Sequence, residues 1–167
     1  MTQVLLRMLF TLLLTLGVGG TTASQDPPPE DPGRPAWAIG THLATWSQGQ
    51  IPDIQDNPEL SLGPVLITTD AERDRLLNSQ PLGPDNDLTQ IAAVDLTASV
   101  LVVAGYHSCM EHGDVWTDGV VVWWDAQTAA GSEHISCAWA PFTVDVTEVP
   151  RSAFSDEIAL VTPPWDH

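Results

Sequence analysis

Lysine is missing from this chain of 167 residues, and its five cationic side chains are all arginines, set against 22 acids. Phosphate backbones and anionic membrane surfaces are both bound through a cationic face. Nucleic acid and anionic membranes are therefore excluded as expected partners. The acidic excess favours solubility outside the cell, with binding of a cation or a basic partner as the sharper alternative.

The usual catalytic motifs are missing as well. A Ser-x-x-Lys nucleophile is impossible without lysine, and neither a Gly-x-Ser-x-Gly elbow nor a phosphate-cradling glycine loop occurs. Acids are so abundant that no pair of carboxylates stands out as an acid and base for hydrolysis. We therefore expect a non-enzymatic protein without a cofactor, and a small carboxylate-based hydrolase stays open as one alternative.

Apolar runs long enough to span a bilayer are also missing. The first run follows Arg7, extends from Met8 to about Val18, and gives way to small residues up to Ser24. This pattern predicts a secretory signal peptide over residues 1–24, and hence a secreted or cell-envelope protein with no membrane contact after cleavage. Residues 25–36 are a proline-rich acidic linker, and 37–167 are expected to form a single β-rich domain.

Short runs rich in valine and leucine, separated by glycine, proline and aspartate, fill the domain. They predict a mainly β (α+β) fold, an antiparallel sandwich or small open barrel of six to eight short strands with one packed helix. Thr69 and Glu72 form a capping box at the start of that helix. Asp118-Gly119 predicts a hairpin. Residues 82–88 are expected to be a loop, and 133–149 one or two strands broken at Pro141.

Only two cysteines are present, and one lies in the most chemically varied stretch, GYHSCMEHGDVW, residues 105–116. In a secreted chain an even pair predicts one disulfide, Cys109–Cys137, with Gly113 allowing the loop beyond it to turn. The alternative is a soft-metal site using His107, Cys109, Met110 and His112, perhaps with Cys137, if the thiols are free. The period of two along a strand places Cys137 and His134 on opposite faces, which disfavours convergence of those ligands.

Tyrosine and phenylalanine are scarce, whereas tryptophan occurs seven times. Trp123 and Trp124 are adjacent, so on a strand they point to opposite faces. An exposed tryptophan often marks a binding surface. We take Trp123 and Trp124, with Glu111 and His112, as the candidate partner surface.

One segment resembles a known family. DLTASVLVVAGYHSC and CAWAPFTVDVTEVPRSAF, within about residues 98–150, are similar to the C-terminal domain family of PrcB-type protease-complex subunits, and VLITTDAERDRLL is similar in placement to its upstream segment. The matching closing residues are Pro141, Phe142, Val144, Val146, Val149 and Pro150. Residues 109–113 depart from the glycine-rich turn of that family. The resemblance implies a secreted accessory or binding domain, with an unknown protein as partner and an extracellular protease as one candidate.

Overall fold

The computed structural model describes residues 36–128, 131, 136–154 and 157–161, which belong to one compact unit, Arg34–His167. The predicted signal peptide and residues 25–35 of the predicted linker lie outside the described residues. The elements in chain order are β1 Trp37–Ala38, β2 Thr41–Ser47, η1 Ile54–Asp56, β3 Gly63–Ile67, α2 Asp70–Asn78, α3 Asp85–Ala92, β4 Ser99–His107, β5 Glu111–Thr117, β6 Val121–Thr128, β7 Phe142–Pro150, η2 Arg151–Ala153 and β8 Ala159–Leu160. Among these elements, no helix has the length and apolar character needed to cross a membrane.

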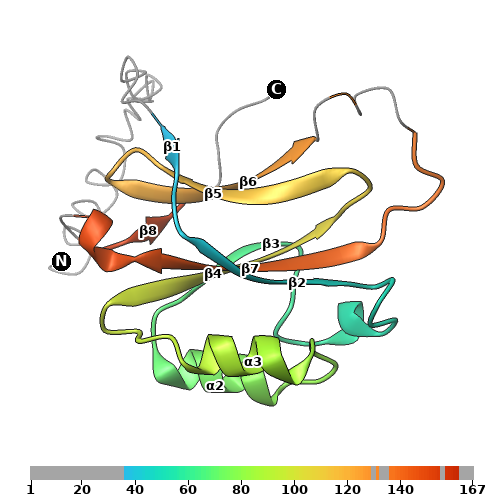
Figure 1. Ribbon diagram of the computed structural model, residues 1–167, viewed down its shortest axis with the longest axis horizontal. Helices are drawn as coiled ribbons and strands as arrows, with labels where there is room; N and C mark the ends of the chain where they lie inside the picture. Colours follow the sequence, from blue (N-terminus) through green and yellow to red (C-terminus); the bar gives the residue numbers. More distant parts are fainter. Residues whose placement is uncertain (1–35, 129–130, 132–135, 155–156, 162–167) are drawn as a thin grey trace, which may run out of the picture. The chain divides into compact units, whose positions relative to one another are not determined.

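The strands form two four-stranded sheets in a mainly β fold, and the described strands do not close into a barrel (Figure 1). Sheet A has the strand order β1-β5-β6-β8, and sheet B has the order β2-β7-β4-β3. Figure 1 shows the two sheets stacked, with α2 and α3 against the outer face of sheet B. The predicted sandwich is therefore confirmed, with a helical layer on one side of it.

Two apolar clusters hold these layers together. The first lies between sheet B and the helices and includes Trp46, Leu76, Ile91 and Val144, each at most 2% exposed. The second joins the two sheets through small β-branched residues, among them Val102, Val115, Val122 and Val149. Because strand side chains alternate between faces, β4 and β7 supply apolar residues to both clusters. This explains their nearly continuous burial along the chain.

Helix α2 begins as the capping box predicts. The Thr69 hydroxyl accepts a hydrogen bond from the backbone of Glu72 at 3.3 Å, and the Glu72 carboxylate accepts one from the backbone of Thr69 at 3.0 Å. Of the apolar residues on this helix, Leu76 is buried, Leu77 is half-buried and Ala71 is exposed. The buried stripe is therefore narrower than a full amphipathic face.

The expectation of one helix is wrong, because α3 occupies residues 85–92, where we predicted part of a loop. Pro84 precedes the helix, and Asp85 and Asp87 lie in its first turn, where carboxylates complement the helix dipole. Ile91 is fully buried, and Asp87 also accepts a hydrogen bond from Trp46 Nε1 at 3.1 Å. The same residue types that favour turns favour helix N-termini, so the sequence pattern did not separate the two.

One strand prediction is confirmed and two need adjustment. The hairpin at Asp118-Gly119 is present between β5 and β6, and Gly119 has the positive φ of 88° that such turns require. The last strand, β8, pairs parallel with β6, so the fold is not wholly antiparallel. The strand expected within 133–149 is confirmed only as β7, since residues 136–141 belong to no strand and 132–135 lie outside the described part.

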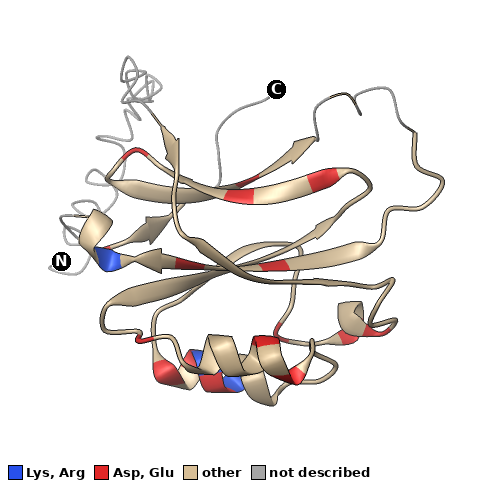
Figure 2. Ribbon diagram, viewed as in Figure 1, with Lys and Arg blue, Asp and Glu red and all other residues tan. Residues whose placement is uncertain are grey.

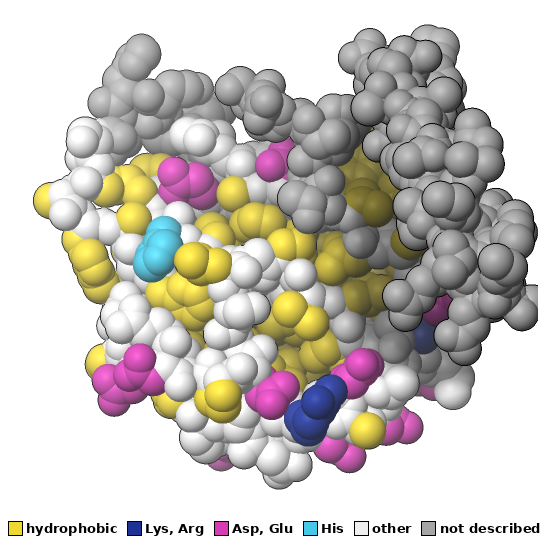
Figure 3. Space-filling view, turned by 180° about the vertical axis from the view of Figure 1, so that it is seen from behind, with side chains coloured by type: hydrophobic (Ala, Val, Ile, Leu, Met, Phe, Trp, Pro, Cys, Tyr) yellow, Lys and Arg dark blue, Asp and Glu magenta, His cyan; other side chains and the backbone are white. Residues whose placement is uncertain are grey.

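Strand β3 forms one free edge of sheet B and exposes apolar side chains there. Leu62, just before it, is 66% exposed, and Val65 within it is 42% exposed. Figure 3 views the molecule from behind, where apolar side chains gather over the middle of the described surface. The opposite edge of sheet B, at β2, is polar and borders the site described next.

Candidate functional site

The site starts from the alternation of strand β7. Phe142, Val144 and Val146 point into the cluster under the helices, so Thr143, Asp145 and Thr147 point toward sheet A. All three polar residues are buried, and Asp145 is only 4% exposed. A carboxylate in such a position needs hydrogen-bond donors, and the neighbouring strands supply them.

Both oxygens of Asp145 accept a hydroxyl hydrogen bond. Tyr106 on β4 donates to Oδ2 at 2.7 Å, and Thr45 on β2 donates to Oδ1 at 2.6 Å. His42 Nε2 lies 2.8 Å from Thr45 Oγ1 and 3.7 Å from Asp145 Oδ1. Because the single hydroxyl proton of Thr45 goes to Asp145, His42 must donate to Thr45. The chain of donors therefore runs toward the carboxylate from both sides.

Tyr106 is held as a neutral donor. Burial, followed by the hydrogen bond to Asp145 and the charge of that carboxylate, raises the pKa of Tyr106 far above its usual value, although a hydrogen bond from the Gly113 backbone opposes this. Its ring packs on Trp124 with centroids 4.8 Å apart. Tyr106 thus links a strand of sheet B to both inner strands of sheet A.

The packing of Trp124 against Tyr106 depends on Gly113, which does not form the turn that we predicted for it. Gly113 lies within β5 without a positive φ, so it does not form a turn. A Cβ at this position would overlap the indole of Trp124. Glycine is required because the Trp124 ring crosses the backbone of β5 on its way to Tyr106.

An open cleft of about 590 Å³ lies in front of this network, between β2, an edge strand of sheet B, and β1 and β5 of sheet A. Ala38, Ile39 and Gly40 also line it, where the chain passes from β1 to β2; Figure 1 shows this passage from sheet A to sheet B. Sheet B contributes His42, Thr45, Ser47 and Asp145, and β5 contributes Glu111, His112 and Asp114. This volume falls within the range of about 300–1,000 Å³ that ligand-binding clefts have.

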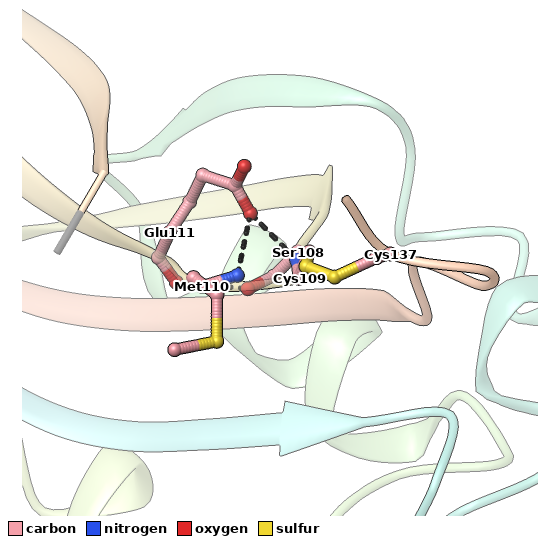
Figure 4. The surroundings of a disulfide bond; sticks show 5 residues. All are labelled: Ser108, Cys109, Met110, Glu111 and Cys137. Carbon is pink, nitrogen blue, oxygen red and sulfur yellow. Dashed lines mark hydrogen bonds between the residues drawn. A yellow bond between two sulfur atoms is a disulfide. The ribbon is translucent and has the colours of Figure 1, made fainter. Parts of the chain in front are cut away.

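Ser108 and Cys109 line the cleft, in the tight turn that carries the disulfide Cys109–Cys137, with Cα atoms 6.0 Å apart. Figure 4 shows the Glu111 carboxylate folded back over this turn, where it accepts hydrogen bonds from the backbone of Cys109 and Met110 at 2.6 and 3.0 Å. These bonds, led by that from Cys109, lower the pKa of Glu111. The predicted disulfide is confirmed, and its turn is fixed by a charged acceptor.

The four residues of the alternative metal site do not converge. His107 Nδ1 faces the carbonyl oxygen of Ala140 at 3.2 Å, and Met110 is 41% exposed. Cys109 is consumed by the disulfide, and His112 Nε2 lies 3.5 Å from Asp114. Within the described ranges, no three His, Cys, Asp or Glu side chains are arranged to hold a metal ion.

The candidate partner surface is divided by the fold. Trp123 points to the outer face of sheet A and is only 9% exposed, whereas Trp124 points inward and is half-buried. Glu111 and His112 line the cleft instead. The most exposed tryptophans in the described part are Trp37, at 44%, and Trp139, at 61%.

The cleft is acidic because the described arginines lie elsewhere (Figure 2). Arg73 on α2 donates to the carbonyl oxygen of Val94 at 2.7 Å. Arg151, in η2, donates to the carbonyl oxygens of Leu96 and Ser99 at 3.1 Å. These cations hold the connections between elements, and the described lining of the cleft includes no arginine.

Sequence reasoning missed His42, Thr45, Tyr106 and Asp145. The one available signal was Asp145 itself, an acid within the apolar strand TVDVTEV. A buried acid in such a strand implies a set of donors, but its partners lie 39 and 100 residues away in the chain.

Family models, curated proteins and solved structures were all compared with this chain, and none matches it. The geometry of the cleft therefore carries the functional argument.

Proposed function

We propose that this chain is a secreted, non-enzymatic binding domain that holds a segment of a protein partner in the cleft between sheets A and B. One observation carries the proposal: an open cleft lies between edge strand β2 and the part of β5 beyond its pairing with β1, over a buried carboxylate held by fixed donors. Free strand edges recruit extended segments through main-chain hydrogen bonds. Pre-arranged side chains then select among them.

The hydrogen-bond directions favour binding over catalysis. A hydroxyl nucleophile needs a base that removes its proton. Thr45 receives a hydrogen bond from His42 and gives its own proton to Asp145, so the histidine does not act as its base. Tyr106 remains neutral, because its pKa is raised.

The disulfide suits an oxidising compartment, in agreement with the proposed secretion. An extracellular protease remains one candidate partner, on the resemblance to the PrcB-type domain family. Residues 98–150 of that resemblance include β4, β5 and β7, and this range supplies most of the residues that line the cleft.

The test places a bulky side chain in the cleft and measures whether partner binding is lost. Ser47 lines the cleft on edge strand β2, whereas Thr41 on the same strand is exposed and outside it. Ser47→Trp and the control Thr41→Trp are each immobilised and incubated with the secreted proteins of the native source, and the captured proteins are quantified by mass spectrometry.

The proposal expects at least one protein that the wild type and Thr41→Trp retain and that Ser47→Trp loses. If every captured protein is retained equally by Ser47→Trp, binding does not use the cleft and the proposal is wrong.

A further inference from the structure

Resting on the proposed function, we infer that the cleft recognises a cationic side chain, lysine or arginine, carried by an extended segment of the partner. The recognising group is Asp145, which is 4% exposed at the base of the cleft. Its two oxygens together offer about four acceptor positions. Tyr106 and Thr45 occupy one on each oxygen, so each oxygen keeps acceptor capacity for a ligand.

The negative charge of Asp145 is only partly compensated. His42 is the nearest basic group, and its side chain is 52% exposed at 3.7 Å from the carboxylate. His112, on the other wall, lies beside Asp114. A buried carboxylate bordered by further acids and low-dielectric walls concentrates a negative potential, which attracts a cation.

The free strand edge favours an extended ligand. The N–H of Ile39 donates to the carbonyl oxygen of Val115 at 2.8 Å, on the side of β5 away from β6. By the period of two, the main-chain groups of Gly113 point to the same edge, where its N–H already donates to Tyr106, so an added segment meets the carbonyl group of Gly113 there. A peptide added along this edge reaches the cleft with its alternate side chains, one of which enters toward Asp145.

The negative charge of the chain disfavours two possible occupants of the cleft, its own linker and a second copy of the protein. Residues 25–36 contain three acids and one arginine, so the linker mismatches an acidic cleft. A second copy of a chain with net charge −17 is repelled for the same reason. The complementary occupant is a basic segment of another protein.

The test uses three pentapeptide probes, Ac-Thr-Val-X-Val-Thr-NH2, with X as arginine, neutral citrulline or glutamate. Each is titrated into ¹⁵N-labelled, disulfide-bonded protein while amide shifts are followed by NMR. The arginine peptide is expected to shift the amides of Thr45, Gly113 and Asp145, with an affinity at least about tenfold above that of the citrulline peptide, as a charge-assisted hydrogen bond supplies.

A matched pair of variants tests whether the negative charge of the cleft contributes to binding of the arginine peptide. Asp114 lines the cleft, and Asp125 lies directly opposite it on β6 but outside the cleft. Asp114→Asn and Asp125→Asn change the net charge equally, and neither alters the Asp145 network. The first is expected to weaken the arginine peptide several-fold, and the second to leave its affinity within twofold.

The outcomes separate the two proposals. If all three peptides shift the cleft amides with equal affinity, the cleft binds peptides but not by charge, and this inference is overturned alone. If none of them shifts those amides at millimolar concentration, the cationic inference is overturned, and the cleft-filling capture experiment still decides the proposed function.

Discussion

The hydroxyl of Tyr106 is one of the two donors that hold Asp145, and its removal should lower stability by a measurable amount. Tyr106→Phe keeps the ring and deletes one oxygen, which donates to Asp145 Oδ2 at 2.7 Å and accepts a hydrogen bond from the Gly113 backbone. A hydrogen bond to a charged group contributes about 1.5–3 kcal/mol, and its loss leaves the carboxylate, 4% exposed, short of a donor. We therefore expect the free energy of unfolding to fall by about 1.5–3 kcal/mol.

The assay is urea unfolding of the disulfide-bonded protein at pH 7, followed by tryptophan fluorescence. The control is Thr147→Val, which removes a hydroxyl on the same face of β7 that makes no hydrogen bond to another described residue. Thr147 is 7% exposed, and we expect its replacement to cost less than about 1 kcal/mol, because no donor is lost to a charge. Equal costs for the two variants would refute the hydrogen-bonded network as the basis of the site.

Three further predictions concern stability. Cys109→Ser and Cys137→Ser should each lower the free energy of unfolding by roughly 3–4 kcal/mol, and the double variant should be no worse; additive losses in denaturant titrations would argue against a shared bridge. Glu72→Ala removes one half of the capping box with Thr69 and should cost about 0.5–2 kcal/mol in the same titrations; no loss would show that the cap is unimportant. The pKa of Glu111 is lowered in the folded state, so its stabilisation is present above its unfolded pKa and is lost as pH falls through the folded value. Glu111→Gln should therefore flatten the decline in urea midpoint below about pH 4.5, and an unchanged decline would contradict that role.

Local signals explain how much of the fold could be predicted. The capping box at Thr69, the Asp118-Gly119 hairpin and the disulfide each depend on residue chemistry that the sequence displays directly. Helix α3 was missed because Pro84 and Asp85 begin turns and helices equally well, and only the burial of Ile91 against the sheet decides between them.

The candidate site was beyond local signals. The stretch around Cys109 drew attention because its residue types are chemically varied, yet the structure uses it to form a turn at one end of the cleft. The two hydroxyl donors to the Asp145 carboxylate lie 39 and 100 residues away from it in sequence. Strand pairing brings them together, and local periodicity does not specify which strands pair. Glu111 and His112, two residues of the predicted partner surface, line the cleft, but their neighbours across it were not found from the sequence.

The most direct test of the cleft as a cation-binding site is the affinity of the arginine peptide for Asp145→Asn, measured by isothermal titration beside Glu148→Gln. Both residues lie on β7, and Glu148 also accepts a hydroxyl hydrogen bond, from Ser99 at 2.7 Å, but outside the cleft. Our account predicts that Asp145→Asn weakens binding about tenfold or more while Glu148→Gln leaves it unchanged. Equal affinity for wild type and both variants would contradict it.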